Sequence, residues 1–332
     1  MSQIQSGSYI QAVTAAVGVV GGAYIAYQIY QKTRLPKEWK YVGKLKNISV
    51  YPIKSCGSVS VENVELTPIG LKKGWLRDRV LMIVDKTNNF ITARVYPELL
   101  LVDCSIKSSV LSIKHKDMEP LHINLAEVVS QETTKQATVW SCPVPVYDCG
   151  EEASEWFNKF LNRPDNNYRL VYYASYNGRL LKDNKKEFNY KKDDTGALPD
   201  EISFNLVNEA SIDDLNKRLN TKVTSRNFRP NFVVTGPEPY AEDNWKFVKI
   251  GDTVFEVIKP CLRCVLTTID PETGVFNPDH EPVETLKTYR TIKDPKLRRL
   301  VGEQPQMGLQ MALRSKVSPG GLLTLNDSVY VA

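Results

Sequence analysis

From about residue 40 onward the chain is dominated by short runs in which apolar and polar residues alternate, which is the period of a β-strand. Clear examples are the runs at 44–55, 58–71 and 79–94, the last of which predicts a hairpin turned at Asn88 and Asn89, and β-type patterns continue at 99–115 and 137–150. Helical patterns are restricted to short segments, at 151–163, 211–220 and 294–302, and Ser211 is the expected N-cap of the second. Because strands and helices do not alternate as βαβ units, the sequence predicts an α+β fold that is mainly antiparallel and partly barrel-like.

A change of composition interrupts this pattern between Pro164 and Pro199. The stretch is polar and loop-like, and it carries the charged tract KDNKKEFNYKKDD at 182–194. It indicates a domain boundary or a large surface insertion. We therefore expect one β-rich domain over 40–165 and a second domain over 175–332.

The first 34 residues have a different character. No charged residue occurs between Tyr9 and Tyr30, and a helix of about 20 apolar residues spans a bilayer core. A cleaved signal peptide would need a positive n-region, and no charge precedes Lys32. Lysines and arginines then outnumber acids in the flank up to residue 40, so the positive-inside rule predicts a signal-anchor over 1–34 with the body in the cytosol. Such an anchor suits the outer mitochondrial membrane or the endoplasmic reticulum.

Composition excludes several classes of protein. The net charge is +5, and no run of basic residues interleaved with aromatics follows a nucleic-acid backbone, so we expect no nucleic-acid partner. Six cysteines in 332 residues argue against a disulfide scaffold. The chain contains no GxGxxG after a strand, no Walker loop, no HExxH and no GxSxG.

The stretch KPCLRCVLTTIDPETG, residues 259–274, is the strongest chemical signal. It places Cys261 and Cys264 on either side of Arg263, after an apolar strand, and the segment VLTTID is expected to continue as a strand. A thiolate ionises where positive charge or a metal stabilises it. The spacing alone leaves open a functional thiol, half of a zinc site, a redox pair or two packed thiols. The zinc site lacks a second Cys/His pair, since the nearby His280 has no partner beside it.

Other short motifs place cations and amides at strand ends. They are Lys54 and Ser55 in YPIKSC, Arg77 and Arg79 around Asp78 in WLRDRV, Arg94 in ITAR, and Arg226, Arg229 and Asn231 in SRNFRPNF. Guanidinium groups bind phosphate in a bidentate manner, and an Asn side chain reads the edge of a planar heterocycle. Any single arginine is more often solvated or paired with a carboxylate such as Asp78. As a set, these residues favour an anionic, planar ligand.

Taken in this order, YPIKSC, LRDRV, ITAR, NFRPN, PCLRCVLTTIDPETG and EPVETLKTYR resemble the MOSC-domain proteins that bind molybdenum cofactor, in particular the mitochondrial amidoxime-reducing components. The resemblance covers nearly all of the chain beyond residue 40. It implies a β-rich MOSC N-terminal subdomain followed by a MOSC domain that resembles a β-barrel. Together with the N-terminal segment, it implies a fold preceded by one transmembrane helix.

The resemblance also implies site residues. The second cysteine of the motif ligates molybdenum in the family, which here is Cys264, and Cys261 is then a packed thiol. The positions that match cofactor-contacting residues are Lys54, Ser55, Arg79, Arg94, Ser203, Arg229, Asn231, Arg263 and Gln310. Two positions depart from the family pattern: only Ser203 supplies a hydroxyl before the NEAS segment, and Leu309 separates Gly308 from Gln310.

The activity implied by the resemblance is the reduction of N-hydroxylated compounds (amidoximes, hydroxylamines and hydroxamic acids) by Mo-molybdopterin. Electrons would come from NADH through cytochrome b5 reductase and cytochrome b5, on the outer mitochondrial membrane facing the cytosol. Peroxisomal and endoplasmic reticulum membranes are alternative locations. The alternative functions are a carrier that binds the cofactor without catalysis, as in MOSC domains attached to sulfurases, and a membrane-tethered interaction protein with a structural CxxC.

Overall fold

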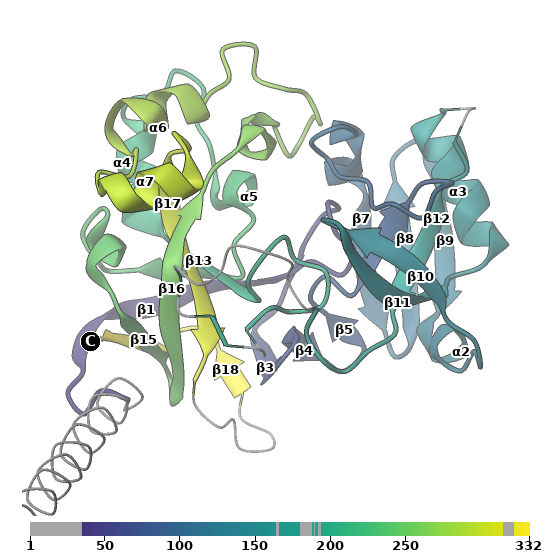
Figure 1. Cartoon of the computed structure of the whole chain (residues 1–332), viewed down its shortest axis with the longest axis horizontal. Helices are drawn as coiled ribbons and strands as arrows, with labels where there is room; N and C mark the ends of the chain where they lie inside the picture. Colours follow the sequence, from purple (N-terminus) through teal and green to yellow (C-terminus); the bar gives the residue numbers. More distant parts are fainter. Residues whose placement is uncertain (1–34, 164–165, 180–187, 189, 192–193, 315–321) are drawn as a thin grey trace, which may run out of the picture. The chain divides into compact units, whose positions relative to one another are not determined.

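The computed structural model describes residues 35–163, 166–179, 188, 190–191, 194–314 and 322–332 (Figure 1). The predicted anchor at 1–34 lies outside these residues, as does most of the charged tract at 182–194. Among the helices within the described ranges, none is both long and apolar enough to cross a membrane. The chain divides into two compact units, Met1–Trp39 and Lys40–Ala332, and everything below concerns the second.

Seven strands of this unit close into a barrel. Their order around the ring is β14 (Phe232–Thr235), β13 (Phe204–Asn208), β17 (Gln306–Leu313), β16 (Thr253–Leu262), β15 (Phe247–Ile250), β19 (Ser328–Val331) and β1 (Lys40–Val50). The ring closes because β1 pairs back with β14, with Lys44 opposite Thr235. Of the seven pairings in the ring, only that between β13 and β14 is parallel. The predicted mainly antiparallel, barrel-containing β fold is confirmed.

Alternation along the strands fills the inside of the barrel. Leu45, Ile48 and Val50 of β1 are fully buried, while the residues between them are more exposed. They pack with the rings of Phe204, Phe232 and Phe255, whose centroids lie 5.3–6.1 Å apart. The period-2 pattern of the sequence thus becomes an apolar interior.

Three smaller sheets come mostly from the first half of the chain. One contains β10 (Lys135–Val139), β11 (Cys142–Asp148), β12 (Arg169–Tyr173) and β6 (Leu81–Val84); a second contains β18 (Leu322–Thr324), β3 (Asn63–Thr67), β4 (Gly70–Lys73) and β5 (Leu76–Arg77); the third contains β7 (Asp103–Lys107), β8 (Val110–His115) and β9 (Met118–Asn124). The short strand β2 (Val59–Ser60) pairs with β1. The stretch 164–199, which we expected to be loop-like, contains strand β12. The buried residues LVYY of β12 lie between β11 and β6 in the first of these sheets.

Helices are few and short. The predicted helix at 151–163 is present as α3 (Glu151–Leu161), and it packs with α2 (Leu125–Val129) in one large core cluster. Helices α4 (Glu209–Asn216), α6 (Val283–Tyr289) and α7 (Pro295–Val301) lie on the same side of the barrel, near α5 (Ser225–Phe228) (Figure 1). Single 3-10 turns are η1 (Pro97–Leu101), η2 (Ala241–Asn244) and η3 (Val265–Thr268).

Three local predictions are wrong. Helix α4 is capped by Asn208 rather than Ser211, whose hydroxyl instead donates to the buried Glu242 carboxylate at 2.7 Å. The segment VLTTID begins with η3 instead of continuing the strand. The chain does turn back after Val84, with a bridge from Val84 to Phe90 and a bond from the Ile91 N–H to the Ile83 carbonyl, but the second half of the hairpin at 79–94 forms no regular strand. Arg94 therefore lies in a turn and not at a strand end.

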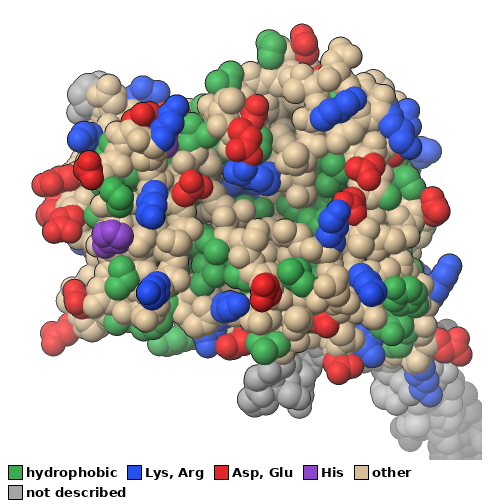
Figure 2. Space-filling model, turned by 180° about the vertical axis from the view of Figure 1, so that it is seen from behind, with side chains coloured by type: hydrophobic (Ala, Val, Ile, Leu, Met, Phe, Trp, Pro, Cys, Tyr) green, Lys and Arg blue, Asp and Glu red, His purple; other side chains and the backbone are tan. Residues whose placement is uncertain are grey.

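Charges of both signs are mixed on the surface. On the face drawn in Figure 2, Lys and Arg side chains are interspersed with Asp and Glu. This distribution agrees with the modest net charge of +5.

Candidate functional site

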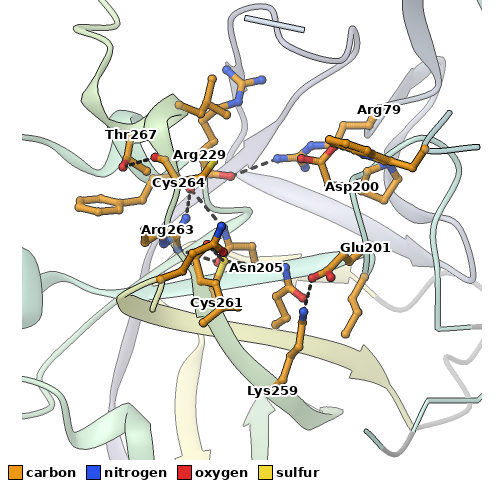
Figure 3. A pocket seen from close by; sticks show the side chains of 18 of the residues that line it. Arg79, Asp200, Glu201, Asn205, Arg229, Lys259, Cys261, Arg263, Cys264 and Thr267 are labelled. Atoms are coloured by element: carbon orange, nitrogen blue, oxygen red, sulfur yellow. Dashed lines mark hydrogen bonds and ion pairs between the residues drawn. The ribbon is translucent and has the colours of Figure 1, made fainter. Parts of the chain in front are cut away.

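A cavity of about 660 Å³ lies at the end of the barrel, and residues of both halves of the chain line it. Among the described lining residues, the cations are Lys54, Arg79, Arg94, Arg179, Arg229, Lys259 and Arg263, and the two carboxylates are Asp200 and Glu201. Figure 3 shows Cys261 and Cys264 beside Arg263 in this cavity. Seven cations against two acids favour a ligand that carries several negative charges.

Cys264 is the half-buried thiol of the cavity. It follows the end of β16 and precedes η3, where the hydroxyl of Thr267 donates to the Cys264 carbonyl at 2.9 Å. The Nε atom of Arg94 donates to the Cys264 sulfur at 3.4 Å. A guanidinium in this position stabilises a thiolate, which is the form that binds a metal.

Asp200 connects the cations on the other side of the cavity. Its carboxylate accepts hydrogen bonds from Lys54, from Arg94 at 2.6 Å and from the indole of Trp140 at 3.0 Å. Burial raises the pKa of Asp200, but the charges of Lys54 and Arg94 outweigh it and hold that pKa well below its usual range. Burial lowers the pKa of Lys54 to about 8, although Asp200 opposes the shift.

Arg79 and Arg229 enclose the ring of Tyr51. Each guanidinium carbon lies 4.4 Å from the ring centroid, a distance typical of cation–π contacts. Arg79 also donates to Asp78 at 2.6 Å and to the Arg229 carbonyl at 3.1 Å. Both arginines, and Ser55, have a positive φ (48°, 50° and 73°), a conformation that costs energy and is often found at functional sites.

Arg263 holds the framework of the cavity. Its guanidinium donates to the Met307 carbonyl at 2.8 Å and to the Phe228 carbonyl at 2.9 Å. Gly308 follows Met307 with a φ of 77°, and a Cβ there would lie 2.4 Å from the Leu206 carbonyl oxygen. Only glycine therefore allows β17 to approach β13 at this point.

Asn231 joins three strands at the same end of the barrel. Its side chain donates to the Ser49 carbonyl at 3.2 Å and accepts from the Asn205 backbone N–H at 3.2 Å. The side chain of Asn205 in turn donates to the Phe228 carbonyl at 3.2 Å. Arg263 and Asn231 thus line the cavity while most of their contacts are to backbone.

Cys261 differs from Cys264. It is 5 % exposed, burial raises the pKa of its thiol, and the Gln310 amide donates to its sulfur at 3.8 Å. Next to it, the buried Lys259 pairs with Glu201 (Figure 3). Cys261 is the packed thiol of the two.

Buried polar atoms without a partner mark the cavity as a binding site. Among the described residues, five buried side-chain nitrogen or oxygen atoms have no hydrogen-bond partner, and four of them belong to lining residues: two on Arg179 and one each on Arg229 and Gln310. Leaving such a group unsatisfied costs about 1–3 kcal/mol. A ligand with several hydrogen-bonding atoms would satisfy them.

The cavity brings together all but one of the predicted site residues. Lys54, Ser55, Arg79, Arg94, Arg229, Asn231, Arg263, Cys264 and Gln310 line it. Ser203 does not: it is 3 % exposed, and its hydroxyl accepts from the Gly196 backbone N–H at 2.7 Å. Ser203 thus bonds to the loop before β13 and is not among the lining residues of the cavity.

Sequence reasoning missed several lining residues, chiefly Trp140, Arg179, Asp200, Asn205 and Lys259. Lys259 stands at the start of the CxxC stretch and could have been selected with it. Arg179 and Trp140 belong to segments without any motif. No group of three or more His, Cys, Asp or Glu residues suited to a metal occurs in the described part of the chain.

Comparison with known proteins identifies two domains. The MOSC N-terminal beta barrel domain matches residues 42–164, and the MOSC domain matches residues 193–329. Mitochondrial amidoxime reducing component 2 of Rattus norvegicus is 36% identical over 90% of this chain and 86% of its own length. Mitochondrial amidoxime-reducing component 1 is 34% identical in Homo sapiens, over 96% of this chain and 92% of its own, and 35% identical in Danio rerio, over 91% and 89%.

Each alignment covers most of the relative's length, and the two matched domains cover most of this chain. The chain therefore belongs to the MOSC-domain family that contains the mitochondrial amidoxime-reducing components.

Proposed function

We propose that this protein is a molybdenum-cofactor oxidoreductase that reduces N-hydroxylated compounds such as amidoximes, hydroxylamines and hydroxamic acids. The observation that carries the proposal is the cation-lined cavity, in which partnerless buried atoms lie near a half-buried thiol. The MOSC domain family is linked to molybdenum cofactor, and the curated relatives are named for amidoxime reduction.

The lining residues fit that cofactor chemically. Molybdenum held by the soft sulfurs of a pterin needs few further ligands, and the Cys264 thiolate is a suitable one. Arg79, Arg179 and Arg229 would bind its phosphate, since two of them keep buried guanidinium atoms without a partner. The Gln310 side-chain oxygen, which also lacks a partner, would accept from a pterin N–H.

The bound cofactor would supply the two-electron reduction at the substrate's N–O bond. The protein's own residues would orient the reacting groups. Arg94 fixes the Cys264 sulfur, and Asp200 fixes Arg94 and Lys54 in turn. The Lys54 Nζ atom, with its pKa of about 8, holds a proton at neutral pH and releases it more easily than an ordinary lysine.

The electron source and location belong to the same proposal. We expect NADH, cytochrome b5 reductase and cytochrome b5 to supply electrons, because the family resemblance implies this chain of carriers. The relatives' names favour a mitochondrial location. The apolar segment at 9–30 and its basic flank favour an anchor in the outer membrane, with the catalytic unit facing the cytosol.

The test is a reconstituted turnover assay. The full chain, loaded with molybdenum cofactor in lipid nanodiscs, is mixed with NADH, cytochrome b5 reductase, cytochrome b5 and benzamidoxime. We expect one benzamidine to form for each NADH oxidised, and no product with Cys264→Ser or without cytochrome b5. Bound cofactor with no reduction of any N-hydroxylated compound would reject the enzyme and indicate a carrier.

A further inference from the structure

A second cavity, of about 440 Å³, lies among β4, β5, α2 and the ends of β11 and β12. Its described lining residues are all different from those of the Cys264 cavity. The volume falls within the range of sites for small organic ligands, about 300–1,000 Å³.

Arg77 gives this cavity its charge. Its Nε atom is the fifth of the buried partnerless side-chain atoms among the described residues, and the other four all line the first cavity. Tyr172 lines the same cavity, and burial raises its pKa while the charge of Arg77 opposes that rise. A buried N–H without a partner is costly, and a ligand oxygen would satisfy it.

The other charges do not compete for that position. Lys72 also lines the cavity, but it pairs with Glu65 at 3.3 Å. The described lining contains no carboxylate. An anion entering the cavity would therefore meet Arg77 without an acidic residue to repel it.

The remaining walls are aromatic. Trp75, Tyr147, Tyr172 and Tyr176 line the cavity, and Tyr176 is 87% exposed. Aromatic side chains offer large flat surfaces for a planar ring and lose little conformational entropy when they bind it.

We infer that this second cavity binds a small planar aromatic carboxylate, with the carboxylate on Arg77 and the ring among the tyrosines and Trp75. The two arginines of WLRDRV thus serve different sites. Arg79 lines the first cavity and Arg77 the second, with the 2 %-exposed Asp78 between them. This inference does not depend on the molybdenum proposal.

The test compares two probes that differ only in charge. Indole-3-acetate and indole-3-acetamide are titrated calorimetrically into the full chain, loaded with its cofactor in nanodiscs, with empty nanodiscs as the blank. We expect the acetate to bind with 1:1 stoichiometry and the amide to bind at least about tenfold more weakly, since a charge-assisted hydrogen bond contributes roughly that factor.

Variants assign the binding to the cavity. Arg77→Gln should weaken indole-3-acetate about tenfold and leave the amide unchanged, while Tyr176→Ala, at an exposed position, should weaken both probes. Arg226→Gln, at an exposed position outside both linings, serves as the matched control and should have no effect. Equal affinity for acid and amide, no binding of either, or acetate binding kept in Arg77→Gln would overturn the inference.

Discussion

Arg94 donates its Nε–H to the sulfur of Cys264 at 3.4 Å, although 170 residues of sequence separate the two. The same guanidinium donates a hydrogen bond to the Asp200 carboxylate at 2.6 Å. That carboxylate also accepts a hydrogen bond from Lys54. The thiol is thus held by an arginine that is itself fixed by a carboxylate. Burial lowers the pKa of Arg94, but the charge of Asp200 outweighs it and raises that pKa above its ordinary value, so the guanidinium stays charged.

Replacement of Arg229 separates binding from stability. We expect Arg229→Met to retain cofactor at least about tenfold less well, because one buried nitrogen of the Arg229 guanidinium has no hydrogen-bond partner and is available for an anion. Burial lowers the pKa of Arg229, so its charge is unfavourable in the folded protein, and the cofactor-free variant should melt no lower than the parent. Molybdenum content after dialysis and the melting temperature measure the two effects.

Arg226→Met is the matched control for this variant. Arg226 is exposed, pairs with Glu272 and lies outside the cavity lining, so its loss should change neither quantity. A marked fall in melting temperature with unchanged retention in Arg229→Met would show that Arg229 is structural.

Lys54 should make stability depend on alkaline pH. Its pKa is about 8 when folded and 10.5 as an ordinary lysine, so between these values the unfolded chain binds a proton that the folded chain has lost. The contribution of Lys54 to the free energy of unfolding should therefore rise as pH increases from about 8 towards 10.5, by up to roughly 3 kcal/mol. The buried thiols of Cys56, Cys149 and Cys261 have raised pKa values and act in the opposite direction, so the contribution is measured as a difference. In urea unfolding across this range, the stability of the parent minus that of Lys54→Met should increase with pH. The exposed Lys217→Met should behave like the parent.

Asp148 should make stability depend on pH in acid, with the same sign as Lys54. Burial raises its pKa, but hydrogen bonds from Arg169 and Lys135 lower it to about 2. Its contribution is fully present above its ordinary pKa of 3.8 and is lost as pH falls towards 2, about 2 kcal/mol in all. Acid unfolding followed by circular dichroism should lose this component in Asp148→Asn and keep it in the exposed Asp213→Asn. An identical acid slope in all three proteins would contradict the assignment.

The encounter with cytochrome b5 should be weakly salt-dependent. A net charge of +5 suits an acidic partner, but charges of both signs are mixed on the face in Figure 2. Screening at higher ionic strength should therefore slow cytochrome-dependent turnover at low cytochrome concentration while leaving the maximal rate unchanged. A rate that does not fall with salt would remove the electrostatic part of the proposal.

The alternating strand pattern predicted the β fold, and the short motifs predicted most of the site residues. Local alternation is visible in β1 and β16, so a barrel-like β fold followed from it. The closure of the ring was not visible, because β1 and β14 pair across nearly the whole chain. The domain division expected between 165 and 175 follows the order of the sequence. In the structure, β1 and β18 each pair with a strand from the other half of the chain.

The failures at single residues have a common cause, which is competition by side-chain hydrogen bonds. Thr267 and Thr268 are β-branched and suggested a strand, but their hydroxyls bond to the carbonyls three residues earlier and stabilise η3. Ser211 bonds to Glu242 instead of capping its helix, and Ser203 bonds to a loop amide instead of lining the cavity. Such partners become known only when the fold is known.

The most direct test of the central claim is the molybdenum and pterin content of the full chain, produced in a host that makes the cofactor, beside Cys264→Ser and Cys261→Ser. We expect about one molybdenum per chain in the parent and in Cys261→Ser, because the buried Cys261 is a packed thiol. Cys264→Ser should lose most of its molybdenum, because its hydroxyl is a poor ligand for a soft metal site. Equal loss in both variants, or zinc in place of molybdenum in the parent, would contradict the assignment of Cys264 as the single protein ligand.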